Sequence, residues 1–216
     1  FGRGLVTTMD DFGRKGAKPT HPGLIDWLAV TFREDDSWSM KRTIRRIVLS
    51  ATYRQSAVAG SAKRAGDSDN VFYARGPRQR LVAELVRDNA LCISGLLSRK
   101  MFGPPVRPVQ PAKVWRVIGE VDNTYYLSKG EDLYRRGIYT LWRRSAHYPS
   151  FANFDAPNRG ACTVNRQSSN TPLQALTLMN DPAFVEMTRA FAARIQQETV
   201  DMNATRSLAH AFRLAL

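Results

Sequence analysis

The chain has 216 residues, of which 43% are hydrophobic and 24% charged, as in ordinary globular domains. No apolar run approaches the roughly 20 residues that a membrane-spanning helix needs, and no signal peptide is visible. The formal net charge is +13, with 25 Arg and 7 Lys. Arg favours bidentate pairing with carboxylates, phosphates and sulfates, so the charge indicates an anionic partner, unless acidic residues elsewhere in a parent chain balance it. Nucleic acid is the least favoured partner, because no helix-turn-helix, RRM or zinc signature is present.

The two ends of the sequence and its cysteines bear on the parent protein and on possible metal or haem sites. It begins at Phe1 rather than Met and ends inside the apolar pattern AFRLAL, so we expect a piece of a longer protein. Cys92 and Cys162 show no zinc spacing and no haem-attachment motif, so we expect no metal site and no cofactor within these residues. Cys92 falls on an apolar helical pattern and is expected in the core; a disulfide is open if the parent protein is exported.

The first 70 residues predict two helices and a loop. Apolar spacing predicts a helix over 21–33 with Thr20 as its N-cap. Ser39 caps a second helix, over 40–51. One face of this helix carries four basic residues without an acidic one, and we expect them to stay solvated: Lys41, Arg42, Arg45 and Arg46. Small and polar residues predict a surface loop over 57–70.

A long amphipathic helix is expected over 81–97, with the Gly-Pro-Pro sequence at 103–105 ending the helical segment. Its acidic residues, Glu84 and Asp88, are expected to form ion pairs with neighbouring arginines. A short helix follows over 112–118. Alternating β-branched and aromatic residues then predict a strand over 138–143, with a helical turn before it at 131–135.

The C-terminal third predicts three more helices. Pro172 marks the first turn of one, capped by Asn170 or Thr171. Asp181 and Pro182 open the next, and the last begins near Asn203. Together these patterns predict a single, mostly α-helical domain over 1–216, irregular, with about seven helices, long loops, at most a minor β element and one shared helical core.

Several strings resemble one family in order along the chain: HPGLIDWLA, SATYRQS, ARGPRQRL, the ISGLLSRKMFGPPV region, RRGIYTLWRR, FDAPNR and NTPLQALTLMNDP. They resemble the C-terminal domain of unknown function of planctomycete-type, cytochrome c-associated envelope proteins (the PSD-type multidomain family). The resemblance implies an exported protein of the periplasm or cell envelope, with neighbouring domains of the parent chain as partners. It also implies that a haem c module can lie elsewhere in the parent protein. The resemblance does not by itself imply an enzyme activity.

The densest polar run, Phe154 to Leu176, holds the candidate site. In a functional interpretation its arginines clamp an anionic group, its amides bind hydroxyls and its carboxylate anchors the ligand, a mixture suited to a sulfated or carboxylated glycan. The candidate ligand-binding residues are His147, Asp155, Arg159, Arg166, Asn170 and Gln174. In a structural interpretation the same carboxylate pairs with Arg159 or Arg166, and the amides satisfy loop backbone.

Two hypotheses of different classes follow. The first is a non-catalytic binding or scaffold module of an exported protein, contacting acidic polysaccharide. The second is a hydrolase-like enzyme that acts on polysaccharide through the polar loop 147–174, using Asp155 and His147. No nucleophile, base and orienting group form a recognisable triad in the sequence, and a second glycosidase carboxylate is missing from the run.

Overall fold

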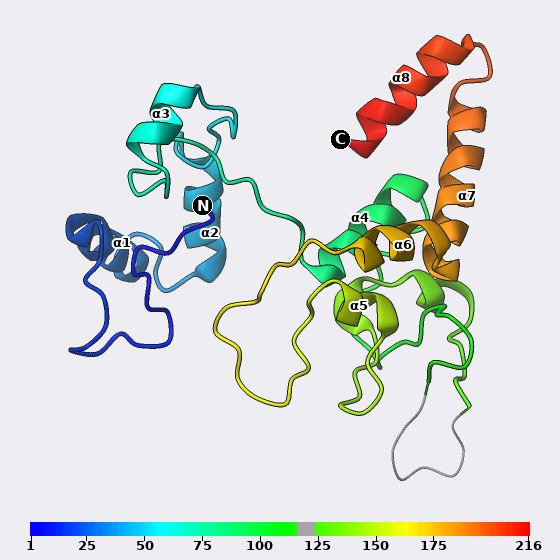
Figure 1. Cartoon of the computed structure of the whole chain (residues 1–216), viewed down its shortest axis with the longest axis horizontal. Coiled ribbons are helices and arrows are strands. Elements are labelled where there is room, and N and C mark those ends of the chain that lie inside the picture. Colours follow the sequence, from blue (N-terminus) through cyan, green and yellow to red (C-terminus); the bar gives the residue numbers. More distant parts are fainter. Residues whose placement is uncertain (116–123) are drawn as a thin grey trace. The chain divides into compact units, whose positions relative to one another are not determined.

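A computed structural model describes residues 1–115 and 124–216, and the chain forms two compact units, residues 1–80 and 81–216 (Figure 1). The described residues contain eight α-helices, two 3-10 helices and no sheet, only three isolated β-bridges. Long loops join the helices. The expected irregular, mostly α fold with a minor β element is therefore confirmed.

The first unit contains α1 (Pro22–Arg33), α2 (Met40–Leu49) and α3 (Ser61–Gly66). The N-cap of α1 is His21 and not Thr20, whose hydroxyl instead donates to the Leu5 carbonyl at 3.3 Å. Ser39 caps α2 as predicted, accepting from the Arg42 N–H. The short helix α3 lies inside the segment expected to be a loop, because its Ala, Lys and Arg residues favour helix despite the low apolar content.

The basic face of α2 is not wholly solvated. Arg46 donates to the buried carboxylate of Asp36 at 2.8 Å, and the Thr43 hydroxyl donates to the same carboxylate at 2.9 Å. Asp36 precedes the helix, and it gives one residue of the basic face, Arg46, a partner that sequence spacing alone did not show. This contact ties the α1–α2 turn to the first unit's second helix.

The second unit begins with α4 (Ala83–Ser94). It ends earlier than predicted, because Gly95 takes the left-handed conformation (φ 79°) and lets the Leu96 N–H return to the Leu91 carbonyl at 3.0 Å. The helical turn expected at 131–135 is confirmed as the 3-10 helix η1 (Gly130–Tyr134). The strand predicted over 138–143 is not formed: the 3-10 helix η2 (Gly137–Tyr139) covers its start, and Thr140 forms only an isolated β-bridge with Val106. Of the helix expected over 112–118, residues 112–115 are non-helical and 116–118 lie outside the described residues.

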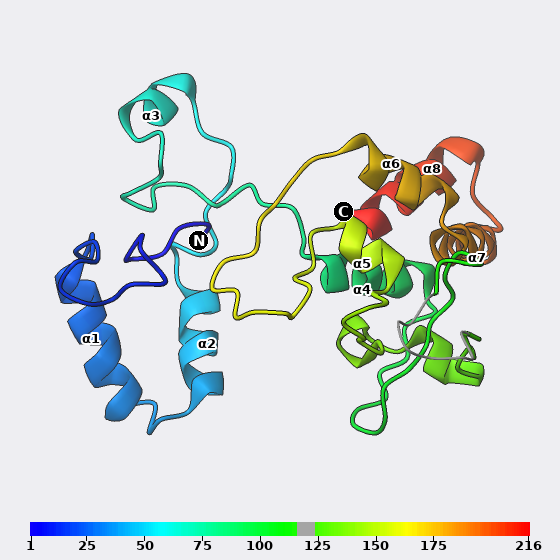
Figure 2. The same ribbon diagram turned by 60° about the horizontal axis from the view of Figure 1, so that its bottom comes forward.

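Three of the four remaining helices begin where the sequence predicts, and the short first one was not predicted. The four helices are α5 (Pro149–Asn153), α6 (Pro172–Asn180), α7 (Pro182–Glu198) and α8 (Ala204–Ala215). Thr171 caps α6 in a capping box with Gln174, Asp181 caps α7 by accepting from the Ala183 N–H at 2.9 Å, and Asn203 caps α8. Figures 1 and 2 show α4 beside α5 and α7, and α6 packs against α5 and α7 to complete the body of this unit.

The buried hydrophobic clusters of the described residues both lie in the second unit. One joins Ala83 to the aromatic residues Tyr148, Phe151 and Phe154, and the other joins Leu91 to Ala183 and Met187. The α4 face that is buried carries Ala83, Arg87, Leu91 and Ser94. Leu85 and Cys92, which the apolar pattern placed in the core, are exposed instead.

The apolar faces of α1 and α2 do not contribute to these clusters. Leu24, Ile44 and Val48 are all exposed, with Ile44 at 53%. The chain divides into two compact units, and the shared core expected from the apolar stripes stays a prediction. No helix among the described residues is long and apolar enough to cross a membrane.

A glycine lets η2 lie directly against α4. A Cβ at Gly137 would meet the backbone of Glu84 at 3.0–3.1 Å. The Gly137 N–H donates to the Asp88 carboxylate at 2.5 Å, and Arg136 pairs with the same carboxylate at 3.7 Å. Burial raises the pKa of Asp88 and these partners only partly oppose it. The ion pairing expected for Asp88 is thus confirmed, and it fixes η2 to the helix.

Candidate functional site

The polar run forms a long loop between α5 and α6, closed at its base by a hydrogen-bonded cluster. The Asp155 carboxylate accepts from the Ser169 N–H at 2.8 Å and from the Ser169 hydroxyl at 2.8 and 3.0 Å. The Gln174 amide, only 4% exposed, donates to the Asn153 carbonyl at 3.0 Å and to the Ser169 hydroxyl at 3.1 Å. Two predicted site residues, Asp155 and Gln174, are therefore brought together where the loop begins and ends.

Asp155 also takes an unusual backbone conformation. Its φ is 61°, in the left-handed region, which Asp tolerates better than most residues because its short side chain can hydrogen-bond locally. The turn places its carboxylate next to Ser169, near the end of the loop. The carboxylate is thereby engaged in closing the loop, as in the structural interpretation of the sequence.

Arg166 connects the loop to α4 through an ion pair. Its guanidinium donates to both oxygens of Glu84, at 2.6 and 3.1 Å. Burial raises the pKa of the Glu84 carboxyl, but the Arg166 hydrogen bond and the charges of Arg166 and Arg159 outweigh it, so this pKa lies below its ordinary value. The ion pairing expected for Glu84 is confirmed, with a partner 82 positions away in sequence.

Arg159 lies over an aromatic ring. Its guanidinium carbon is 4.4 Å from the centre of the Trp142 ring, a cation–π contact, and its own φ of 57° is left-handed. Trp142 also contacts the ring of His147, 5.4 Å away, and stacks on Phe151. The His147 Nε2 is buried without a hydrogen-bond partner among the described residues. Arg159 and His147 thus share one aromatic support.

The two loop arginines line an open groove of about 450 Å³. Arg144 is the third basic residue of its wall, and the remaining lining residues are Pro157, Gly160, Ala161, Cys162 and Thr163. Neither Arg144 nor Arg159 forms an ion pair with the described residues, whereas the charge of Arg166 is compensated by Glu84. The groove therefore carries two guanidinium groups without an ion pair to the described residues and can accept an anion.

The predicted site residues fall into separate settings. Arg159 and Arg166 line the groove, His147 lies beneath Arg159's aromatic support, and Asp155 and Gln174 close the loop base. Asn170 is exposed and is not among the groove-lining residues. Sequence reasoning missed Arg144, although the basic doublet that ends RRGIYTLWRR was a signal for it.

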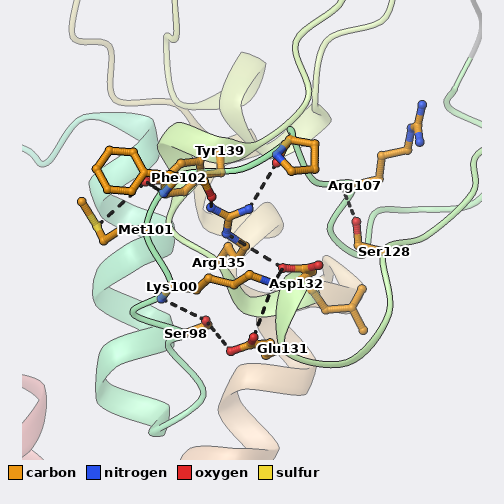
Figure 3. Close-up of polar contacts among 12 residues, drawn as sticks. Ser98, Lys100, Met101, Phe102, Arg107, Ser128, Glu131, Asp132, Arg135 and Tyr139 are labelled. Carbon is orange, nitrogen blue, oxygen red and sulfur yellow. Dashed lines mark hydrogen bonds and ion pairs between the residues drawn. The ribbon is translucent and has the colours of Figure 1, made fainter.

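A second feature that the sequence did not reveal is a buried arginine, Arg135, only 1% exposed (Figure 3). Its guanidinium donates to the carbonyls of Phe102 and Pro104, the latter at 3.2 Å, and lies 3.9 Å from the centre of the Tyr139 ring. Asp132 is 4.0 Å from its Nε. Arg135 therefore binds together η1, η2 and the turn that follows α4.

That turn is held in a strained form. Phe102 has a φ of 62° and is 80% exposed, while its N–H donates to the Tyr139 hydroxyl at 2.9 Å. Lys100 reaches Asp132 at 3.1 Å on the other side of the network, as Figure 3 shows. Because a non-glycine residue with positive φ costs free energy, the buried guanidinium is what keeps this turn in place.

No group of three or more His, Cys, Asp or Glu side chains that could hold a metal ion occurs among residues 1–115 and 124–216. Both cysteines are free and exposed. Tyr148 is the N-cap of α5, Tyr125 packs against the ring of Trp115, and burial raises the pKa of both hydroxyls far above the ordinary value. They therefore act as neutral hydrogen-bond donors, to the Val109 and Pro108 carbonyls.

Comparison with known proteins identifies the family of the chain. A family model described as PSD1, protein of unknown function (DUF1553), matches residues 1–216. The chain belongs to the PSD1 family. No curated protein and no solved structure matches the chain. The family description names no activity, so function is argued from the groove and its charges.

Proposed function

We propose that this PSD1 domain is a non-catalytic binding module that contacts acidic polysaccharide through the groove of the 154–171 loop. The observation that carries the proposal is the pair of guanidinium groups, Arg144 and Arg159, that line the groove without an ion-pair partner among the described residues. Guanidinium groups bind sulfate and carboxylate oxygens through two parallel N–H···O bonds. The cation–π contact of Arg159 orients its group and leaves its N–H donors available.

The loop geometry supports a preformed site. Its base is closed by the Asp155, Ser169 and Gln174 cluster, and its far side is fixed to α4 by Arg166. A loop held at several points loses less conformational entropy on binding than a free one. The groove can therefore present its charges without first having to fold around the ligand.

The engagement of Asp155 favours this module over a polysaccharide hydrolase. Both carboxylate oxygens accept hydrogen bonds from Ser169, which supports a role in closing the loop. A glycosidase pair would also need a second carboxylate facing the same groove, and none of the groove-lining residues is acidic.

The proposal also includes the parent protein of this domain and its location. The family resemblance supports an exported, cell-envelope parent protein of planctomycete type, in which a haem c module lies on other residues. In such a protein the neighbouring domains would be the first partners of this one. Acidic polysaccharide is a ligand that an envelope protein would meet.

A charge-matched comparison tests the proposal. Arg144→Gln with Arg159→Gln should elute from a sulfated-glycan column at clearly lower salt than the unchanged chain. The control, Arg42→Gln with Arg45→Gln on α2, removes the same charge from another surface and should shift elution much less. Equal shifts for the two pairs would mean diffuse attraction and would refute a groove-specific site.

A further inference from the structure

The first unit holds an apolar cavity that the groove argument does not use. It has a volume of about 370 Å³, within the range of small-molecule sites. Its apolar walls come from the N-terminal segment, α1, α2 and the loop after α3: Leu5, Leu24, Trp27, Leu28, Ile47 and Tyr73. Arg46 also lines it but is already paired with Asp36. The cavity therefore suits an apolar group.

A basic groove of about 500 Å³ adjoins this cavity. Four arginines line it against one acidic residue, Asp69: Arg3, Arg64, Arg75 and Arg78. Arg75 is committed to the loop, since its guanidinium donates to the carbonyls of Asp67 and Ser68, both at 2.7 Å. Arg64 and Arg78 have no ion pair among the described residues, so the groove keeps a net positive charge.

Arg3 lies where the two spaces meet, because Arg3 and Phe1 line both. Its guanidinium is 3.9 Å from Asp69, a carboxylate that is 74% exposed, and its Nε is buried with no hydrogen-bond partner in the described part of the chain. A weak, exposed ion pair of this kind contributes little, so an incoming anion can replace it. Arg3 is thus placed to bind a charged head next to an apolar body.

The wall between the two spaces is already ordered. The Asp67 carboxylate accepts from the N–H groups of Val71 and Phe72, at 2.7 and 3.0 Å. Asn70 donates to the Arg75 carbonyl at 2.9 Å, and the Tyr73 hydroxyl donates to the Arg3 carbonyl at 3.5 Å. The site needs no refolding of this loop to admit a ligand.

We propose that the first unit binds an amphipathic anion, a free medium-chain acyl carboxylate, with its chain in the apolar cavity and its carboxylate on Arg3. Charge complementarity selects the carboxylate, and the apolar walls select the chain. Arg64 and Arg78 add positive potential on the groove side. This site lies wholly in residues 1–80 and is independent of the polysaccharide groove.

Titration calorimetry of the whole chain with octanoate tests the site. Octanoate should bind at least about tenfold more tightly than acetate, which lacks the chain, or 1-octanol, which lacks the charge. Arg3→Gln should weaken octanoate binding about tenfold, and Arg14→Gln, an exposed change away from both spaces, should leave it unchanged. Arg78→Gln removes an exposed side chain and should weaken binding severalfold even if Arg3→Gln does not fold.

Each alternative result overturns the proposal in a distinct way. Acetate binding as tightly as octanoate would indicate an anion site alone, and octanol binding as tightly would indicate an apolar cavity alone. Unchanged octanoate binding in both folded variants would place the ligand elsewhere. Binding to phosphatidylglycerol vesicles without binding of free octanoate would replace the ligand with a membrane surface.

Discussion

At the scale of single residues, two buried charged side chains stabilise their units through hydrogen bonds to neighbouring segments. Asp36 accepts from Arg46 and Thr43 across the α1–α2 turn, and Arg135 serves two carbonyls of the turn after α4. The hydrogen bonds of Asp36 have a pH-dependent consequence.

The stability of the first unit should fall in acid because of Asp36. The Arg46 hydrogen bond lowers the pKa of its carboxyl, burial opposes this, and the Thr43 hydrogen bond adds to the lowering, so the folded pKa lies below the ordinary value. A depressed pKa gives stability that is fully present above the unfolded pKa, about 4, and is lost as pH falls through the folded pKa.

We therefore expect Asp36→Asn to be less stable than the unchanged chain at pH 6, with the difference shrinking as pH falls below about 4. Urea unfolding at a series of pH values measures it. Asp35→Asn is the matched control, since this neighbour is 65% exposed and 3.9 Å from Arg46, and should alter stability little at any pH. A constant difference at all pH values would contradict the account.

Arg135→Met should destabilise the second unit by about 1–3 kcal/mol, because it leaves the Phe102 and Pro104 carbonyls without their donor. Arg135→Lys should rescue little, since an ammonium group cannot form the two-pronged contact or stack on Tyr139. Arg99→Met, on an exposed arginine of the segment before the same turn, is the control and should cost less than about 0.5 kcal/mol. Equal free energies of unfolding for the two Met variants would show that the hydrogen bonds of Arg135 to the turn do not stabilise the unit.

At the scale of elements, what the sequence revealed was mostly local. The caps at Ser39, Asp181 and Asn203 were predictable because a cap depends on a side chain and the N–H groups two or three positions later. The predicted strand was wrong because the segment starts in η2 and pairs with Val106 only through an isolated bridge at Thr140, so no strand extends from it. The prediction of a buried Cys92 was wrong because contacts with α7 and with the aromatic cluster determine which face of α4 is buried.

The loop between α5 and α6 should behave as one closed element. Asp155→Ala and Ser169→Ala each break the same contact, so their effects on the free energy of unfolding should be non-additive by about 1 kcal/mol. Ser168→Ala, on the exposed neighbouring residue, should be additive with Asp155→Ala. Additive effects of Asp155→Ala and Ser169→Ala in the double-mutant cycle would show that the carboxylate does not close the loop.

At the scale of the whole molecule, charge and helix content were predictable and the site was predictable only in part. The polar run correctly drew attention to Arg159 and Arg166, which line one groove. Arg166 is paired with Glu84, far away in sequence, whereas Arg159 lies over the Trp142 ring. Neither spacing nor composition could predict that the two arginines differ in this way. The division into two units likewise depends on contacts that no local pattern encodes.

The groove contains a chemical reporter of its own occupancy. Cys162 is free, exposed and part of the groove wall, whereas Cys92 is free and exposed on α4 and is not a groove-lining residue. Alkylation of the two thiols by iodoacetamide can be followed separately by mass spectrometry of peptides. Cys92 therefore serves as the internal control for any general effect of added polyanion.

The most direct test of the proposed module is the rate of this alkylation with and without a sulfated oligosaccharide. If the ligand occupies the groove beside Arg144 and Arg159, Cys162 should react several times more slowly while Cys92 is unchanged, and Arg144→Gln with Arg159→Gln should abolish the protection. Equal slowing of both thiols, or no slowing of Cys162 under conditions in which the oligosaccharide binds, would contradict the account.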